Sequence, residues 1–509
     1  MKKKHWFLSL IILFLVSAQL CVAQSNYEIT PKVTQAYDAV MSLRFGEAQA
    51  LIEDIKTNDP ENLMVYHVEN YIDFLTVFIN EDKAELEKLE ASNKSVRLEK
   101  LKEGDPSSPY YKFTQAEVLL QWALARSKFY DDAFLNVDRI LLNDINKAYR
   151  LLEANNREFP EFIANKKSLS VIHALAEYLP GALKKLFSIR GSLKLGLEEI
   201  EEVVAYGKNN DFLFAKEADA IHAYMLAHLF NQSDEAWDVL MASNLDPKES
   251  PLAAFLLGTI GLQAGRNAEV VDILSQRNRG KEYFHFPYLD FVLGKGKLYM
   301  LDKHAAKDIN SFITEHKGRH FVKEAYQKLG WAALAIDKDE DQYKQYLRMS
   351  LDHGHDLLED DLQAIKEAKQ KNIPDIVLLR ARLLYDGGYF DRAYDELKQH
   401  EVSYKKSKDK RLEYHYRMGR IAHALLKYDE AKQYYLYSIG AGMKANSFFA
   451  CNSALQLGLI SENQEYYEEA VKYFEVCLKL KPAIYKSQLH NKAKAGLNRI
   501  KKVDLSYNR

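Results

Sequence analysis

The sequence predicts an all-α protein whose main part is a linear array of helical hairpins. One position of a helical pattern recurs at steps of 34, 36, 36, 51, 38 and 39 residues. It is occupied by Tyr224, Gly258, Gly294, Gly330, Ala381, Gly419 and Gly458. Only 11 prolines and 22 glycines occur in 509 residues, and Leu, Ala, Glu and Lys are frequent, which favours helices. One hairpin cannot bury its apolar face alone, so such units are expected to stack.

The stretch 457–482 illustrates the hairpin pattern. Small residues let two helices approach closely, and Gly458 and Ala470 supply them. Phe474 is large enough to fill the seam between the helices. Pro482 ends the second helix, because proline lacks an N–H and clashes with the preceding turn. Matching second helices carry Ala236, Ala306, Ala393, Ala431 and Ala470.

These residues resemble the tetratricopeptide repeat family, over 217–509 and again over 29–62. The resemblance implies a tetratricopeptide-type α-solenoid, a right-handed superhelix in which the first helices line a concave groove. Within 168–206, Leu179-Pro180 precedes Gly196-Leu197, which resembles a segment of the eukaryotic inclusion-body-clearance family of tetratricopeptide proteins. The second proline of that family's pattern is missing, and no function is carried over from it.

Four regions follow along the chain: a signal peptide at 1–23, an N-terminal helical region with degenerate repeats at 24–210, the solenoid at 211–484, and a capping helix at 485–509. In the second region, one helix is expected over 110–129 and another ending near Pro160. The step of 51 residues predicts an extra charged helix over 358–371.

The N-terminus has the pattern of a secretory signal peptide. Three lysines at 2–4 precede the apolar run 6–16, and Ala23 offers a small residue for cleavage. We therefore expect a periplasmic or secreted protein, with membrane anchoring by residues 6–23 as the alternative. Leu20 stands before Cys21 where lipidation requires a small residue. No second apolar run of that length follows, so the mature chain is not expected to span a membrane.

Charge and cysteine content exclude two classes of protein. The net charge of −2 argues against nucleic acid as a partner. Three cysteines cannot form a disulfide scaffold. Because Cys451 and Cys477 look offset along their helices, two separate buried thiols are expected, with a bridge left open.

No nucleophile elbow, phosphate-binding loop, dinucleotide fingerprint or zinc-protease pattern occurs, so we expect no catalytic residue, cofactor or metal. Three clusters were weighed against that expectation. The acidic-histidine segment 352–361 is expected to be a solvated loop rather than a metal site. His316 and His320 are four residues apart, but Gly318 spoils their geometry as a ligand pair. The aromatic run 283–288 is expected to be core.

The resemblance implies that groove residues lie three before, one after and four after each recurring glycine. The candidate peptide-binding residues are therefore Phe255, Phe291, Lys295, Trp331, Arg382, Tyr385, Tyr416, Arg420 and His423. Along the chain they change from apolar to basic and aromatic, which suits an acidic or aromatic peptide. The alternative for Arg382 and Arg420 is pairing with neighbouring carboxylates.

The sequence thus favours a non-enzymatic periplasmic scaffold that binds a protein or peptide in its groove, within an envelope complex. One alternative is a glycan- or nutrient-binding module of an outer-membrane uptake system, in which Trp331 would stack on sugars. Another is a metal-dependent enzyme that uses the acidic-histidine segment.

Overall fold

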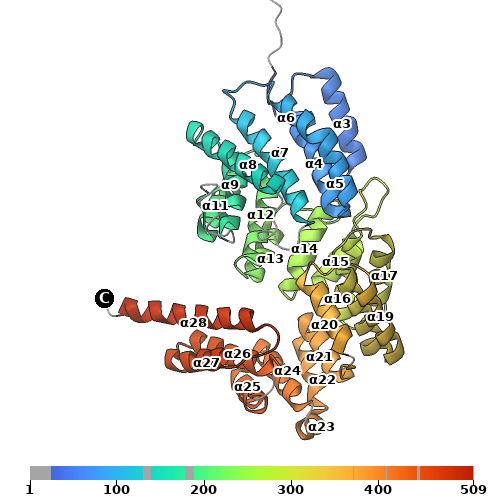
Figure 1. The fold of residues 1–509 in the computed structure, drawn as a ribbon, viewed down its shortest axis with the longest axis vertical. Helices are drawn as coiled ribbons and strands as arrows, with labels where there is room; N and C mark the ends of the chain where they lie inside the picture. The colour runs from blue at the N-terminus through green and yellow to red at the C-terminus, as the bar shows by residue number, and fades with distance from the viewer. Residues whose placement is uncertain are drawn as a thin grey trace, which may run out of the picture. The chain divides into compact units, whose positions relative to one another are not determined.

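A computed structural model describes residues 25–129, 139–177, 189–370, 372–407, 410–443 and 447–507. The expected signal peptide at 1–23 and all of residues 179–186 lie outside these residues. The all-α prediction is confirmed, since the described residues form helices and turns with a single isolated β-bridge between Asn26 and Asn62 (Figure 1). None of these helices is both long enough and apolar enough for a membrane crossing.

The described chain divides into two compact units. The first contains the described residues up to Ala264, together with Asp272–Leu289 and Thr314–His320. The second contains Gly265–Val271, Asp290–Ile313 and the described residues from Phe321 onward. Residue 211, where the solenoid was expected to begin, lies inside the first unit.

The helices that lie wholly in the first unit are α2 (Pro31–Met41), α3 (Phe45–Asn58), α4 (Met64–Asn80), α5 (Lys83–Leu89), α6 (Ser95–Leu101), α7 (Pro109–Ser127), α8 (Arg139–Glu158), α9 (Ala164–Ala176), α11 (Leu193–Asn209), α12 (Ala215–His228), α13 (Ser233–Ala242) and α14 (Pro251–Gln263). The boundary between the units falls within α15 (Asn267–Gln276), α16 (Tyr288–Tyr299) and α17 (Ala305–Glu315).

The second unit continues with α18 (Val322–Ala332), α19 (Glu340–Asp352), α20 (Glu359–Gln370), α21 (Ile376–Asp386), α22 (Phe390–Lys398), α23 (Glu401–Lys406), α24 (Arg411–Ala424), α25 (Tyr428–Gly442), α26 (Phe449–Asn463), α27 (Tyr467–Lys479) and α28 (Lys486–Tyr507). Short π-helical turns occur at Glu90–Lys94 and Ala333–Asp337. The predicted extra helix is confirmed as α20.

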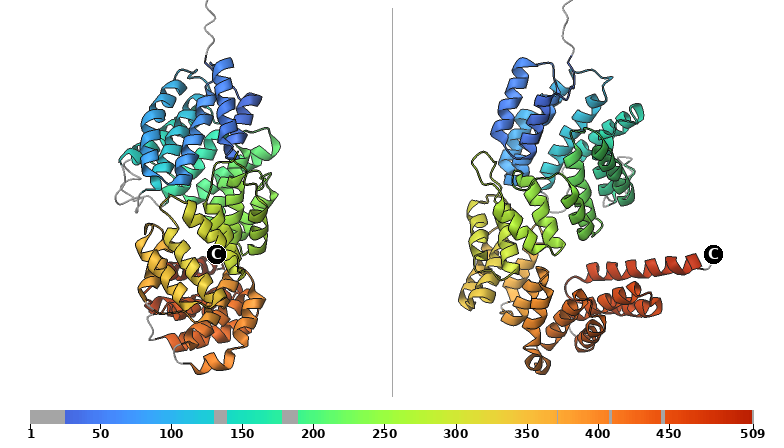
Figure 2. Two further views of the ribbon diagram at one scale, coloured as in Figure 1. Left: turned by 90° about the vertical axis from the view of Figure 1, so that its right-hand side faces the viewer. Right: turned by 180° about the vertical axis from the view of Figure 1, so that it is seen from behind.

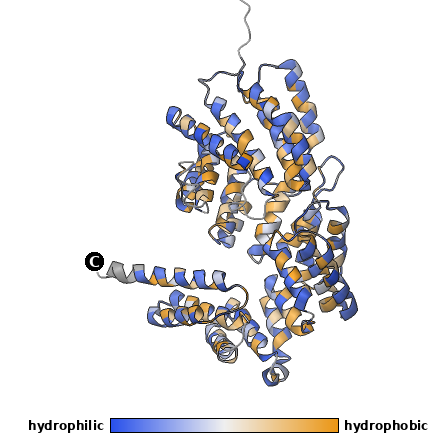
Figure 3. Cartoon of the chain, viewed as in Figure 1, coloured by the Kyte–Doolittle hydropathy of each residue, from blue (hydrophilic) through white to orange (hydrophobic). Residues whose placement is uncertain are grey.

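Neighbouring helices pack as hairpins, as the repeat pattern predicts. Pairs such as α12 with α13, α24 with α25 and α26 with α27 lie side by side. The recurring residues from Tyr224 to Gly458 fall in α12, α14, α16, α18, α21, α24 and α26, which are the first helices of successive hairpins. The chain is therefore an all-α helical-repeat solenoid. Figure 3 shows polar and apolar residues sharing individual helices, as amphipathic packing requires.

Close helix approach explains the glycines at the recurring position. A Cβ atom on Gly458 of α26 would stand 2.5 Å from the Phe474 ring of α27. A Cβ atom on Gly496 of α28 would meet the same ring, also at 2.5 Å. Phe474 is thus held between glycines of the two flanking helices, which lie beside α27 in the red part of Figure 2. Apolar residues of α28 are buried there, so this helix covers the last hairpin as expected.

In the first unit, α2 packs against helices that follow it by well over a hundred residues. The Tyr37 hydroxyl donates a hydrogen bond of 2.9 Å to Glu217 at the start of α12. The Tyr37 ring also meets Phe214 edge-on at 5.6 Å. Beyond α2, the amide of Phe284 donates to the carbonyl of Leu43 at 2.7 Å. The first unit therefore contains long-range packing in addition to contacts between successive hairpins.

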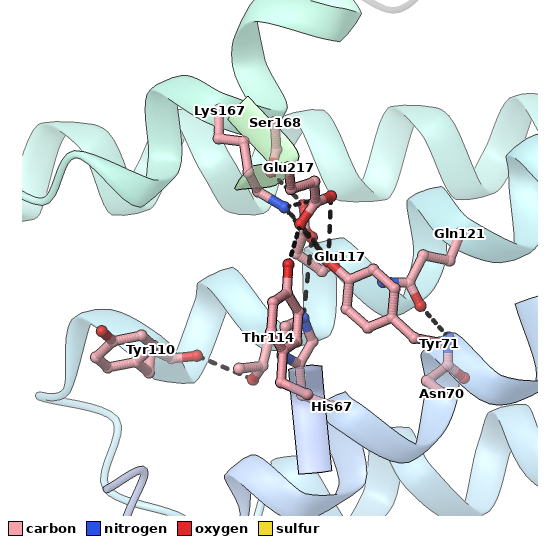
Figure 4. A network of polar contacts seen from close by, with 11 residues as sticks. His67, Asn70, Tyr71, Tyr110, Thr114, Glu117, Gln121, Lys167, Ser168 and Glu217 are labelled. Atoms are coloured by element: carbon pink, nitrogen blue, oxygen red, sulfur yellow. Dashed lines mark hydrogen bonds and ion pairs between the residues drawn. The ribbon is translucent and has the colours of Figure 1, made fainter. Parts of the chain in front are cut away.

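A buried ionic network links four helices of the first unit (Figure 4). Lys167 of α9 lies 2.8 Å from the Glu117 carboxylate of α7 and 2.9 Å from the Glu217 carboxylate of α12. The Tyr71 hydroxyl of α4 donates to Glu217 at 3.0 Å. Only 1% of the Lys167 side chain is exposed, so these carboxylates must compensate for the loss of its hydration.

Candidate functional site

The second unit contains a groove with a volume of about 1180 Å³. Residues from α18, α20, α21, α24 and α26 form its walls, and Tyr485, Gln488 and Leu489 close it at the beginning of α28. The elements are first helices of successive hairpins together with the inserted helix and the covering helix. A hollow of this kind follows from hairpin stacking, because each first helix presents the same face to the same side.

Five of the nine predicted binding residues line this groove, namely Trp331, Arg382, Tyr385, Tyr416 and Arg420. Their spacing relative to Gly330, Ala381 and Gly419 predicted that they would line a common groove. Peptide binding by these five residues stays a prediction.

The other four candidates lie elsewhere. Phe255 belongs to the first unit and stacks on Phe286 at 5.5 Å. Phe291 is fully buried and stacks on Phe312 at 5.0 Å. Lys295 lies 3.5 Å from the Glu324 carboxylate and 4.7 Å from the Phe291 ring. Each of these three residues contacts a neighbouring side chain, and none of them lines the groove.

His423 is the fourth candidate outside the groove lining. Its ring meets Tyr435 edge-on at 6.2 Å. Burial lowers its pKa, and the positive charge of Arg420 lowers it further. His423 therefore stays uncharged near neutral pH and adds no positive charge to the region.

Trp331 is held by the inserted helix α20, which the spacing argument did not consider. Its indole N–H donates to Glu367 of α20 at 2.8 Å, and only 2% of Trp331 is exposed. The same carboxylate accepts from the Tyr343 hydroxyl at 2.9 Å and from Gln327 at 2.7 Å. The sequence did not indicate this role of Glu367, because carboxylates in a charged helix are normally exposed to solvent.

Charged residues of both signs line the groove. The cationic ones are Lys328, Lys366, Arg382, Lys410, Arg417 and Arg420, and the anionic ones are Asp360, Glu367, Asp375, Asp386 and Glu413. Five of the six cations lie within 4 Å of a carboxylate. Arg382 is one of them, since Asp386 lies 3.6 Å away and its guanidinium also covers the Trp331 ring at 4.4 Å.

Arg420 differs from the other cations of the groove. Its Nε and Nη2 donate to the Tyr385 hydroxyl at 3.2 and 2.8 Å, and its Nη1 donates to the Tyr416 hydroxyl at 2.9 Å. Burial would lower the pKa of this guanidinium, but the two tyrosines raise it above its usual range. Arg420 is therefore a fixed positive charge in a partly desolvated position.

The acidic-histidine segment, the histidine pair and the aromatic run each lie in a different environment. Residues 351–356 are exposed, but the expected solvated loop does not extend to 361, because Glu359 begins α20 and Asp361 is buried and accepts from the amides of Phe321 and Glu324. His316 and His320 both turn toward Glu81, at 3.9 and 2.9 Å. Burial would raise the pKa of Glu81, but His320 and Lys128 lower it below its usual range. Within the described residues, no group of three or more His, Cys, Asp or Glu side chains is placed to hold a metal ion. In the aromatic run, Phe284 packs on Phe45 at 4.9 Å.

The cysteine prediction needs a correction. Cys451 and Cys477 are both buried free thiols, as expected. Their sulfur atoms nevertheless lie 3.5 Å apart, so they are not offset along α26 and α27.

No family model matches the chain, and no curated protein matches its sequence.

Proposed function

We propose that this protein is a non-enzymatic scaffold of the cell envelope that binds an extended peptide or protein segment in the groove of its second unit. We also propose that its hairpins are of the tetratricopeptide type. The single observation that carries the proposal is that Arg382, Tyr385, Tyr416 and Arg420 meet along one groove. Arginine and tyrosine are the residue types that most often dominate binding energy at protein interfaces.

Two further features support a peptide ligand. The groove runs across several successive hairpins, and an extended segment contacts many such elements at once. The paired charges along its walls offer hydrogen-bonding groups of both signs to a peptide backbone. Export to the envelope is supported by the lysine and apolar pattern of residues 2–16.

Photocrosslinking in the cells that produce the protein tests this proposal. A photoreactive amino acid replaces Gln488 in one variant and Gln370 in another, because both line the groove. The control position is Val402 of α23, which is 69% exposed and does not line the groove. We expect the same envelope protein to be captured from both groove positions and not from Val402.

Capture from Val402 alone would place the binding surface outside the groove and overturn the proposal. Trp331 is a poor crosslinking position, because it is only 2% exposed.

A further inference from the structure

Arg420 is the only one of the groove's six cationic side chains that has no carboxylate within 4 Å among the residues that the structure describes. Its described hydrogen-bond partners are the hydroxyl groups of Tyr385 and Tyr416, which carry no formal charge at neutral pH. A half-buried charge without a counter-ion is costly, because water solvates it incompletely. Arg420 is therefore a positive charge of the groove that none of the described carboxylates contacts.

Some hydrogen-bond donors of the Arg420 guanidinium are also unused. A guanidinium carries five N–H donors, and the three bonds to the tyrosines use three of them. Each terminal nitrogen of Arg420 therefore keeps one N–H for another acceptor.

The tyrosine hydroxyl groups are oriented by the bonds they accept. The Tyr416 oxygen accepts from Arg420 at 2.9 Å and from Asn452 Nδ2 at 2.7 Å, which occupies both of its lone pairs. The Tyr385 oxygen accepts two bonds from Arg420. Both hydroxyl hydrogens must therefore point away from Arg420, and neither has an acceptor within the described part of the chain.

We propose that the cluster of Arg420, Tyr385 and Tyr416 is a binding seat for one carboxylate of the bound peptide. This inference rests on the proposed function. A carboxylate only accepts hydrogen bonds and carries one negative charge, so it matches both the unused donors and the positive charge of Arg420. A phosphate dianion fits less well, because Arg420 is the only lining cation without a described carboxylate contact, so a second negative charge would have no such partner. The carboxylate belongs to an aspartate or glutamate side chain or to a peptide C-terminus.

Peptide libraries with a common random neutral core distinguish these sources on the purified full-length protein. The first library has blocked ends and one Asp or Glu, and the second has no acidic residue but a free C-terminal carboxylate. The third has neither group, and the fourth has blocked ends and one phosphoserine. Retention on immobilised protein is quantified by mass spectrometry. We expect at least one carboxylate library to be retained about tenfold better than the neutral one, as for a charge-assisted hydrogen bond.

Two substitutions assign the preference to the seat. Arg420→Gln should abolish the carboxylate preference. The matched control is Arg417→Gln, one turn earlier on α24, because Arg417 lines the same groove but pairs with Glu413. It should keep the preference. Tyr385→Phe retains the ring beneath Arg420 and removes one hydroxyl, so a partial loss is expected even where Arg420→Gln impairs folding.

The outcomes separate the two proposals. Retention of all four libraries to the same extent, unchanged by Arg420→Gln, would overturn the seat and leave peptide binding in place. A preference for phosphoserine would also overturn it. If no library is retained better than on resin carrying the denatured protein, peptide binding itself is wrong.

Discussion

Lys167 shows how a single buried residue holds distant helices of the first unit together. The positive charge of its ammonium group is balanced by the Glu117 and Glu217 carboxylates. Water contributes little, since only 1% of the Lys167 side chain is exposed. Burial lowers the pKa of Lys167, but the two carboxylates outweigh that effect and raise it. The residue therefore remains charged, and its removal leaves the Glu117 and Glu217 carboxylates without their cation.

We predict that Lys167→Met destabilises the first unit by about 3–5 kcal/mol, because breaking one side of a buried ion pair costs that much. Hydrogen exchange of peptides from α4 and α7, measured by mass spectrometry, reports the loss. The control is Lys166→Met. Lys166 pairs with Glu202 at the surface, where such pairs contribute about 0–1 kcal/mol. Equal effects of the two substitutions would show that the network carries no special stability.

The pH dependence of this network has a definite sign. Burial would raise the pKa of Glu117, but Lys167 and His67 lower it below its usual range. A carboxylate with a lowered pKa stabilises the fold above its unfolded pKa of about 4.3, and the contribution is lost as the pH falls further. In Lys167→Met the unpaired Glu117 has a higher pKa. The difference in unfolding free energy between variant and parent should therefore be larger at pH 7 than at pH 4.5.

At the scale of elements, the seams between helices depend on close approach at glycine. Gly458 and Gly440 form a natural comparison, because both lie within helices of adjacent hairpins. A Cβ atom on Gly458 would clash with Phe474, whereas a Cβ atom on Gly440 would meet nothing within 4 Å. The same substitution should thus have opposite effects at the two positions.

We predict that Gly458→Ala destabilises the second unit by about 1–3 kcal/mol through overpacking. Gly440→Ala should stabilise it by about 0.5–1 kcal/mol, because alanine loses less conformational entropy than glycine in a helix. Urea unfolding followed by circular dichroism measures both. A gain in stability from Gly458→Ala would mean that α26 and α27 lie further apart than described.

The inserted helix α20 is a second element whose role can be tested. Glu367→Ala removes the acceptor of the Trp331 indole and the Tyr343 hydroxyl, which should cost about 1–3 kcal/mol for each buried group left unsatisfied. Faster tryptic cleavage at Lys366 and Lys369 is expected. Glu359→Ala serves as the control, because Glu359 is exposed in the first turn of the same helix. Unchanged cleavage in Glu367→Ala would show that α20 is held by other contacts.

At the scale of the whole molecule, the regular repeats were predictable from the sequence. The segments and contacts that depart from the repeat pattern were predictable only in part. The positions from Tyr224 to Gly458 follow from sequence, because close helix packing demands small residues at a fixed period. The groove residues after Gly330 followed from the same register. Phe291 did not, because spacing does not reveal that its ring stacks on Phe312 of α17. The buried network joins Glu117, Lys167 and Glu217, which follow one another at separations of 50 residues. No local sequence pattern predicts a contact over such separations.

Removal of residues 483–509 tests how far disturbance spreads through the chain. Leu489 and Ile500 of α28 are 6% and 3% exposed, and each contributes about 1.5–3 kcal/mol on burial. We expect faster hydrogen exchange in α26 and α27 and unchanged exchange in α4 and α7, because stacked hairpins stabilise mainly their neighbours. A uniform increase along the chain would show that the two units unfold together.

The contact between Tyr37 and Glu217 has a consequence for biosynthesis. These partners are separated by 180 positions, so a nascent chain that has exposed only α2 and α3 cannot yet complete their packing. The packing of α2 on α12 must wait until α12 has left the ribosome, and the apolar surface of α2 stays exposed in the meantime. A chaperone that shields the emerging chain would therefore act mainly during synthesis of the first half of the protein.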